Sequence, residues 1–222
     1  MSNNFLARNS DLIENPSPRC ACILVLDTSG SMSGEPIREL NAGLSQFIKE
    51  VQEDEFTSYS VEVGVITAGG YVVEQLPITP AHQINSFSQL NADGSTPLGE
   101  AVNKALDTLE IRKNEYKKAG VAYYQPWLVL ISDGAPTDNW QSAAQRAQEM
   151  AKQRKLVVIP VGVQGADMTK LSAFSSRPAK SLSGLKFREF FEWLSASMTR
   201  VSSSASTSSS VELPSTGGWD SI

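Results

Sequence analysis

The chain has 222 residues, of which 41% are hydrophobic, and its 24 acidic and 19 basic residues give a net charge of −5. This length supports one sizeable core but hardly two, so we expect one main domain. The charge pattern lacks the basic stripe of nucleic-acid-binding proteins, which excludes nucleic acid as the expected partner. A single histidine, His82, leaves little material for proton transfer near neutral pH.

The first 18 residues are polar and contain no apolar signal core, and we expect them to form an N-terminal extension. The longest apolar runs are far shorter than the ~20 residues of a membrane helix, so no membrane association is expected. Cys20 and Cys22 are too close for an ordinary disulfide and, with one histidine, too few for a four-ligand zinc site. We therefore expect both to be small core residues of a cytoplasmic protein.

Buried strands are predicted by four apolar runs, which alternate with stretches of helical period. This alternation is typical of a doubly wound α/β fold with a mostly parallel sheet and helices on both faces. Gly69-Gly70 separates one run from residues 71–76, which predicts an antiparallel hairpin whose second strand lies at the sheet edge. The runs occupy residues 22–26, 61–67, 128–132 and 157–163.

Helices are predicted where apolar residues recur at three- and four-residue spacing. Asp138 is the expected N-cap of the third helix, and the acidic run 53–55 is expected to be a solvated helix end. The four helical patterns cover residues 37–51, 98–109, 140–151 and 187–201. These elements define an expected domain over residues 19–201.

After residue 201 the composition becomes serine-rich and cannot bury enough apolar area to offset its ordering entropy, so residues 202–222 are expected to form a flexible tail. Residues 213–217, Leu-Pro-Ser-Thr-Gly, match the sortase sorting pattern, but the hydrophobic segment and basic tail that such a signal needs do not follow. A docking element with Leu213 and Trp219 as apolar anchors is the alternative that we favour for this tail.

Polar residues gather where two of the predicted strands end. Asp27, Ser29 and Ser31 follow the first strand at alternate positions, and Asp133 follows the strand that ends at residue 132. Thr96 stands in the loop that enters the second helix. Because ligands of open α/β sheets bind outside the carboxyl ends of the strands, we expect these five side chains to converge.

Three hydroxyls and two carboxylates form a set of hard oxygen donors, which favours a hard cation. Magnesium commonly takes one or two carboxylates and keeps several waters, whereas calcium gathers more acids, so Mg²⁺ is the expected ion and Mn²⁺ its substitute. We expect Ser29, Ser31 and Thr96 to bind the ion directly, and Asp27 and Asp133 to bind it directly or through water. An open coordination position would then accept an Asp or Glu of a partner protein.

The pattern Asp27-x-Ser29-x-Ser31, Thr96 and Asp133-Gly134 resembles the metal-ion-dependent adhesion site (MIDAS) of von Willebrand factor type A (VWA) domains, over roughly residues 18–200. The resemblance implies a doubly wound sheet and binding of a protein ligand through the metal. The segments 26–37 and 132–138 look like the bacterial TerY-like branch. This branch implies a cytoplasmic protein of tellurite or stress-response systems, with a kinase or phosphatase as partner.

The residues around Asp27 and Ser29 are compatible with three other interpretations. The Ser29-Gly30-Ser31 loop can be an ordinary turn whose hydroxyls cap the next helix. Asp27 can be the nucleophile of a haloacid-dehalogenase-like phosphohydrolase, but the second acid which that chemistry needs two residues later is replaced by Ser29. A serine hydrolase would have to use His82, which we expect in a surface loop. The sequence therefore predicts a binding module that is not an enzyme, in which Asp27→Ala abolishes metal-dependent binding and leaves the fold intact.

Overall fold

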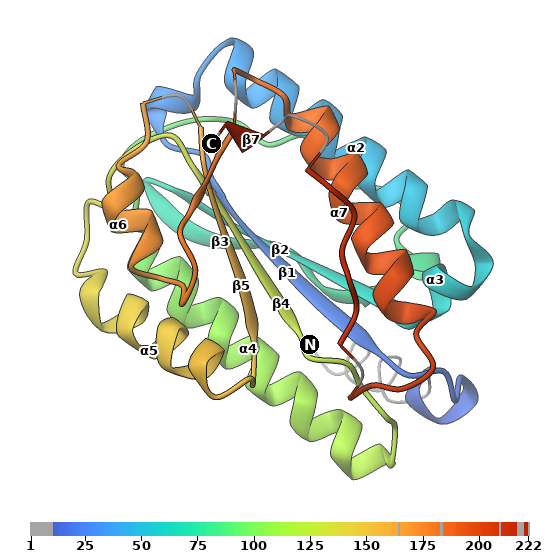
Figure 1. Ribbon diagram of the computed structural model, residues 1–222. Coiled ribbons are helices and arrows are strands. Elements are labelled where there is room, and N and C mark those ends of the chain that lie inside the picture. The colour runs from blue at the N-terminus through green and yellow to red at the C-terminus, as the bar shows by residue number, and fades with distance from the viewer. Residues whose placement is uncertain (1–10, 164, 183, 209, 217–219, 222) are drawn as a thin grey trace.

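A computed structural model of the chain describes residues 11–163, 165–182, 184–208, 210–216 and 220–221. Within these residues the strands form one sheet in the order β3-β2-β1-β4-β5-β6-β7 (Figure 1). The strands are β1 (Cys20–Asp27), β2 (Val61–Gly69), β3 (Tyr71–Pro80), β4 (Trp127–Ser132), β5 (Val157–Gly162), β6 (Lys180–Leu182) and β7 (Asp220–Ser221).

The predicted fold class is confirmed: the sheet is mostly parallel, and β3 pairs antiparallel with β2 at one edge. The short strands β6 and β7 extend the sheet beyond β5 and were not predicted. β7 is antiparallel to β6, so the second edge also ends in an antiparallel pair. The order reverses direction around β1, which places the ends of β1 and β4 side by side.

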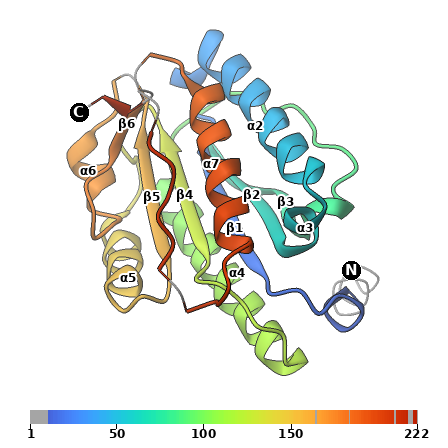
Figure 2. The same ribbon diagram turned by 45° about the vertical axis from the view of Figure 1, so that its right-hand side comes forward.

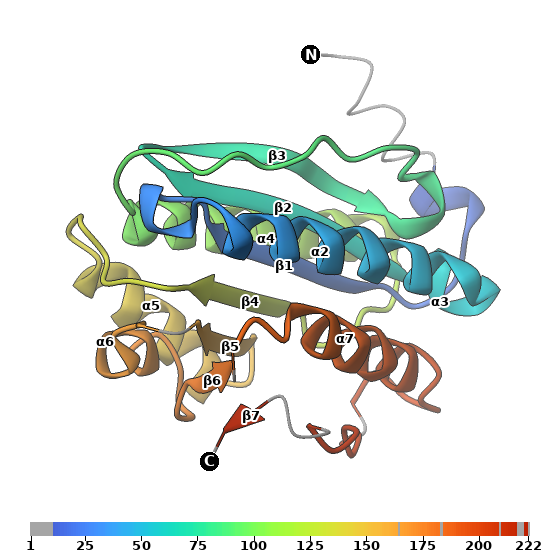
Figure 3. The same cartoon turned by 90° about the horizontal axis from the view of Figure 1, so that it is seen from above.

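Helices cover both faces of the sheet, as Figures 2 and 3 show. One face packs against α2 and α7, and the other against α4, α5 and α6. The helices are α2 (Glu35–Glu53), α3 (Glu55–Ser60), α4 (Leu98–Ala119), α5 (Gln141–Lys152), α6 (Met168–Ser172) and α7 (Phe187–Ser202), with short 3-10 turns η1 (Gly30–Met32) and η2 (Ala81–Gln83). None of the described helices is both long enough and apolar enough to span a bilayer.

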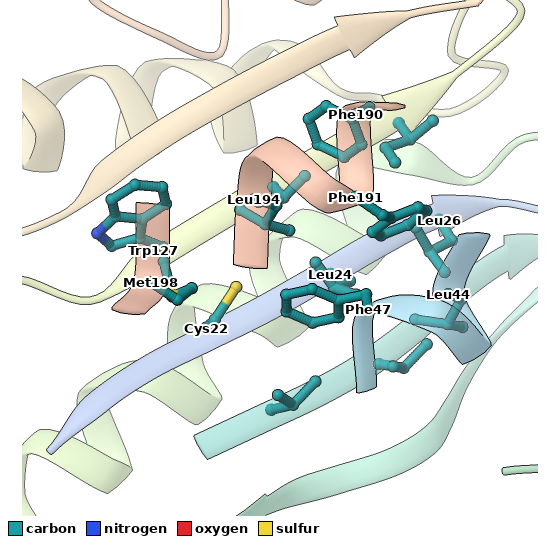
Figure 4. Packing of buried hydrophobic residues seen from close by; sticks show 14 of the residues in the cluster. Cys22, Leu24, Leu26, Leu44, Phe47, Trp127, Phe190, Phe191, Leu194 and Met198 are labelled. Carbon is teal, nitrogen blue, oxygen red and sulfur yellow. The ribbon is translucent and has the colours of Figure 1, made fainter. Parts of the chain in front are cut away.

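Burial on both faces explains why β1 is an unbroken apolar run. Its even-numbered residues from Cys20 to Leu26 pack toward α2 and α7, and its odd-numbered residues from Ala21 to Val25 pack toward α4. Figure 4 shows Cys22 among Met198 and Trp127. Both cysteines are free and fully buried, and burial raises the pKa of the Cys20 thiol to about 12, so these thiols are inert core groups.

The acidic run 53–55 is an exposed helix end, as predicted, since α2 ends at Glu53. Asp54 has a second role that was not predicted: it accepts a hydrogen bond from the amide of Thr57 and caps a further helix, α3. Asp138 does not cap α5, which begins at Gln141 without a side-chain cap. The Asp138 carboxylate accepts instead from the amides at the start of α4, a contact across the sequence that local pattern could not show.

His82 was expected in a surface loop and lies instead in η2, partly buried. Its ring stacks on Tyr59 with the centroids 4.3 Å apart, and Nδ1 lies 3.2 Å from the carbonyl oxygen of Ser58. This turn follows the end of β3 that pairs with Glu62, at the amino end of β2. His82 therefore lies at the amino ends of the parallel strands, whereas the loop that follows β1 lies at their carboxyl ends.

The tail also differs from the flexible segment that its composition predicts. Val211 and Leu213 pack against the core, and the carbonyl of Pro214 accepts a hydrogen bond of 2.9 Å from Nε1 of Trp193. This part of the chain runs alongside α7 (Figures 1 and 2). The serine-rich composition did not indicate that the two apolar residues after it pack on the domain. Leu213 therefore contacts the chain's own core. Trp219, the other expected anchor, lies outside the described residues, and the division at residues 18 and 201 stays a prediction.

We expect Leu213→Ala to destabilise the protein by about 1–2 kcal/mol, less than a fully buried leucine because Leu213 is only partly covered. Urea unfolding followed by tryptophan fluorescence would measure this change. Ser215→Ala is the matched control, since Ser215 is exposed in the same segment. Equal stabilities of the two variants would show that the tail does not contribute to folding through Leu213.

Candidate metal centre

Asp27 ends β1 and is fully buried. One carboxylate oxygen accepts a hydrogen bond of 2.9 Å from the amide of Ser29, and the other accepts one from the hydroxyl of Ser132 at the end of β4. The two neighbouring strands β1 and β4 are thus joined at their carboxyl ends through this side chain. Ser132 was not among the predicted site residues, although its position beside Asp133 was the signal for it.

The next loop brings the two predicted serines to the loop after β4. The hydroxyls of Ser29 and Ser31 lie 3.0 Å apart, and the Ser31 hydroxyl donates to a carboxylate oxygen of Asp133 at 2.9 Å. Ser29 is buried, Asp133 is half-buried and Ser31, which lies between them in this row of oxygens, is exposed. The row begins beside Asp27, and a ligand can reach it at Ser31.

Burial raises the pKa of Asp133 above the usual range for an aspartate, and the nearby charge of Asp27 raises it further, whereas the hydrogen bond from Ser31 lowers it. The ionised carboxylate is therefore disfavoured in the folded protein without a compensating positive charge. As the pH rises through this raised pKa, folding stability is lost rather than gained. A cation at this position would reverse that cost.

Glycines allow the loop before Thr96 to approach the loop after β1. The amide of Gly30 donates to the carbonyl of Gly94 at 2.9 Å, and the amide of Gly70 donates to the carbonyl of Ser95 at 2.7 Å. A Cβ on Gly94, whose φ is +69°, would lie 2.5 Å from the Cα of Gly70. The glycine turn after β2 therefore contacts the backbone of the Thr96 loop directly and holds that loop in position.

Thr96 is 5% exposed and lies between the other two loops. Its amide donates to the hydroxyl of Thr137 at 3.0 Å, and its carbonyl accepts from the amide of Thr137 at 3.0 Å. Thr137 follows Asp133 by four residues, so the reciprocal pair ties the Thr96 loop to the Asp133 loop. The Thr96 hydroxyl makes no hydrogen bond within the described part of the chain, which leaves it available to a ligand.

The donor set fits a small divalent cation. Mg²⁺ binds oxygens at about 2.0–2.1 Å in octahedral geometry, which places neighbouring ligands about 2.9–3.0 Å apart. The separations of 3.0 and 2.9 Å along Ser29, Ser31 and Asp133 agree with that spacing. Among the described residues no group of three or more His, Cys, Asp or Glu side chains could hold a metal, so an ion here has to draw on hydroxyls. Assignment of the five residues as ligands stays a prediction.

Comparison with protein families shows what this arrangement belongs to. Residues 22–193, more than half of the chain, match the family model of the von Willebrand factor type A domain. The chain belongs to the VWA family. The predicted resemblance is confirmed at this level, and no finding supports its TerY-like branch. VWA domains are in general interaction modules. The comparison with curated proteins gave no match.

Solved structures show the same VWA fold at low identity. The pilus adhesin SpaC from Lactobacillus rhamnosus GG, in an open conformation, aligns with a TM-score of 0.68 and 15% identity over 83% of this chain and 30% of its own. Proximal thread matrix protein 1 from the mussel byssus, with a zinc-occupied MIDAS motif, gives 0.58 and 18% over 82% and 48%. The manganese-loaded TRAP protein of Plasmodium vivax gives 0.51 and 19% over 72% and 64%.

This VWA chain spans 30% to 49% of the first six of these structures. The likeness at these identities therefore concerns the fold of one domain within longer chains.

Proposed function

We propose that this VWA domain binds Mg²⁺, with Mn²⁺ as substitute, and through the ion binds an Asp or Glu of a partner protein. Ser29, Ser31 and Thr96 supply hydroxyl ligands, and Asp133 and Asp27 bind the ion directly or through water. Asp27 also holds the serine loop, because it accepts from the Ser29 amide. The row of oxygens from Ser29 to Asp133 at the carboxyl ends of β1 and β4 carries this proposal. The zinc- and manganese-loaded relatives support a divalent ion at such a site.

The bound ion supplies a positive charge, and the protein supplies its position. The metal ligands come from loops that hydrogen bonds hold together, and Ser31 and Asp133 border the surface. A partner carboxylate gains most from the charge when docking excludes water, so the ion adds orientation and specificity as well as affinity. The proposed activity is therefore recognition without chemical conversion.

The geometry argues against the phosphohydrolase alternative. Asp27 is fully buried, and its two carboxylate oxygens hold the Ser29 amide and the Ser132 hydroxyl, so the side chain is not exposed to an incoming phosphoester. His82, the base that a serine hydrolase would need, lies near the amino end of β2, about six residues of strand or roughly 20 Å from the Ser29 loop. Both observations support a binding role for this edge of the sheet.

We expect Ser31→Ala to weaken Mg²⁺ binding by on the order of tenfold or more, because it removes the central oxygen of the row. Isothermal titration of the purified protein with MgCl₂ measures this, and a pull-down in Mg²⁺ and in EDTA measures the dependence of partner capture. Ser33→Ala is the control, since Ser33 is exposed in the same loop. Partner capture that persists in EDTA would contradict the proposal.

The TerY-like resemblance leads to a finer proposal, in which the protein acts in a bacterial tellurite or stress-response system and its partner is a kinase or phosphatase. No comparison supports this assignment, which rests on the segments 26–37 and 132–138. Mass spectrometry of proteins that are retained on the domain in Mg²⁺ and released by EDTA tests it. Recovery of acidic partners from outside these enzyme classes would replace it.

A further inference from the structure

We propose that Thr137 and Asp138 are positioning residues of the metal centre, which fix the Asp133 loop to the Thr96 loop before any ion binds. We call these two residues the clamp. The inference rests on the proposed function, because the geometry that the clamp maintains is that of the ion's ligands. The observations that support the clamp do not involve the ion, since the clamp consists of hydrogen bonds among the chain's own groups.

The Thr137 side of the clamp is a closed pair of hydrogen bonds with Thr96. The Thr137 hydroxyl accepts from the Thr96 amide and the Thr137 amide donates to the Thr96 carbonyl, each at 3.0 Å. Thr137 is itself exposed, so its side chain is not held there by burial in the core. Two bonds to one residue fix both position and orientation, and the residue that they fix is a predicted ligand.

The Asp138 side of the clamp holds the start of α4. Its two carboxylate oxygens accept from the amides of Gly99 at 3.1 Å and Glu100 at 2.8 Å. The amide of Leu98 donates to the Thr96 carbonyl, and Pro97, which precedes it, has no amide hydrogen. The first amides of α4 are thereby satisfied, and a negative charge lies at the positive end of its helix dipole.

Sequence position makes this use of Asp138 informative. An aspartate three residues before α5 would be well placed to start that helix, yet α5 has no side-chain cap. The carboxylate binds a helix start 38 to 39 residues earlier in the chain. The bonds therefore connect the two ligand loops rather than complete the nearest local structure.

A close backbone approach strengthens the same connection. A Cβ on Gly99 would lie 2.6 Å from the Cα of Trp140 and 3.1 Å from a carboxylate oxygen of Asp138. The residue at position 99 therefore has to be glycine for the loop after β4 to reach α4. The clamp and this contact lie side by side at the same helix start.

The clamp makes a direct contribution to ion affinity. Loops that an ion has to order lose part of the binding free energy to ordering, whereas loops held in advance do not. All the oxygens of the two clamp side chains accept from backbone amides, so they act on the ion through Thr96 and Asp133. Partners that orient metal ligands typically change affinity by roughly 10- to 100-fold when they are replaced.

The test compares Thr137→Val, Thr137→Ser and Asp138→Asn with the wild-type protein. We expect Thr137→Val and Asp138→Asn to bind Mg²⁺ roughly 10- to 100-fold more weakly in isothermal titration, and Thr137→Ser, which keeps the hydroxyl, to restore wild-type affinity. In the metal-free protein, amide hydrogen exchange of Thr96 should become faster in Thr137→Val, and that of Gly99 and Glu100 in Asp138→Asn. These amides report the clamp without any ion.

Asp54→Asn is the matched control. The Asp54 carboxylate also accepts from an amide at a helix start, that of Thr57 in α3, but α3 precedes the amino end of β2, far from the metal centre. This variant should therefore lose stability without losing Mg²⁺ affinity. Wild-type affinity in Thr137→Val, a residue exposed enough to be replaced without unfolding, would overturn the clamp and leave the proposed function in place. Failure of the wild-type protein to take up Mg²⁺ would overturn the proposed function, and the clamp's role with it.

Discussion

Asp133→Asn is expected to weaken Mg²⁺ uptake by about 100-fold, which corresponds to about 2.7 kcal/mol of binding free energy. The substitution keeps an oxygen acceptor for the Ser31 hydroxyl but removes one of the site's two negative charges. Burial and the Asp27 charge both disfavour the ionised Asp133 carboxylate, so the cation relieves a cost that the asparagine does not carry. Isothermal titration at constant ionic strength measures the change in affinity.

Asp93→Asn separates ligation from general charge. Asp93 is exposed, and its backbone amide bonds the carbonyl of Thr28 in the same group of loops. This control removes the same unit of charge near the same edge without taking an oxygen from the row of Ser29, Ser31 and Asp133. Equal losses of affinity in the two variants would show that Asp133 acts only through the field of the surface.

Asp27 is a less clean test of ligation than its sequence position suggests. The sequence predicted that Asp27→Ala leaves the fold intact, but the carboxylate is fully buried and accepts from Ser132 and from the Ser29 amide. Its removal leaves the Ser29 amide without this acceptor, at about 1–3 kcal/mol for a buried group, and leaves the Ser132 hydroxyl only its longer contact of 3.4 Å with the Gly134 carbonyl. Loss of ion binding in that variant would mix lost ligation with a displaced serine loop.

The elements that sequence predicted well are those whose signal is local. β1 and β4 are buried on both faces, so their sequences are continuous apolar runs. The glycine pair at the end of β2 predicted the hairpin with β3. The convergence of the Ser29 and Asp133 loops followed from a rule about strand ends, which holds for any sheet of this topology. Local pattern and topology together were sufficient to locate the candidate site at the carboxyl ends of β1 and β4.

What sequence could not predict depends on contacts between distant segments. The three-residue strand β6 has no apolar run of its own and exists because β5 offers it an edge. Asp138 satisfied the local rule for capping α5, yet the amides of α4 lie closer in space. Leu213 follows a serine-rich stretch, and only the position of α7 shows that it has a surface to cover.

A further missed feature is a buried ion network around Glu62, which interrupts the apolar run of β2. Its carboxylate accepts two hydrogen bonds of 2.7 Å from Arg112 and one of 2.6 Å from the hydroxyl of Tyr116. Nε of Arg19 lies 3.4 Å from the same carboxylate. All four residues are at most 2% exposed, and Glu62 shares the compensation of the two arginine charges with Asp11, which pairs with Arg19, and Glu115, which pairs with Arg112.

The pKa shifts in this network have the directions that such compensation requires. Burial acts to lower the pKa of Arg112, but Glu62 outweighs it and the guanidinium holds its proton more firmly than usual. Burial, with the negative charge of Glu62 added, raises the pKa of Tyr116, so its hydroxyl stays protonated and donates. The raised pKa values of Arg112 and Tyr116 therefore keep both groups protonated, as donors to Glu62, across the neutral range.

Glu62→Ala is expected to destabilise the protein by about 3–5 kcal/mol, because it removes the fully buried carboxylate that bonds Arg112 twice and leaves the two buried arginine charges only partly compensated. Glu62→Gln should cost nearly as much if charge dominates, and much less if its hydrogen bonds are sufficient. Urea unfolding at pH 7 measures both. Glu115→Gln is the control, since Glu115 also bonds Arg112 but is partly exposed, and we expect it to cost at most about 1 kcal/mol.

The effects of Glu62→Ala on stability and of Asp133→Asn on Mg²⁺ binding are expected to be independent, because the two residues lie far apart. Glu62 pairs with Pro80 at the amino end of β2, whereas Asp133 follows the carboxyl end of β4, and effects at separated positions without shared partners add. The folded fraction of Glu62→Ala should therefore bind Mg²⁺ as the wild type does. A Glu62→Ala protein within about 1 kcal/mol of wild-type stability would mean that water reaches Arg19 and Arg112 and replaces the carboxylate.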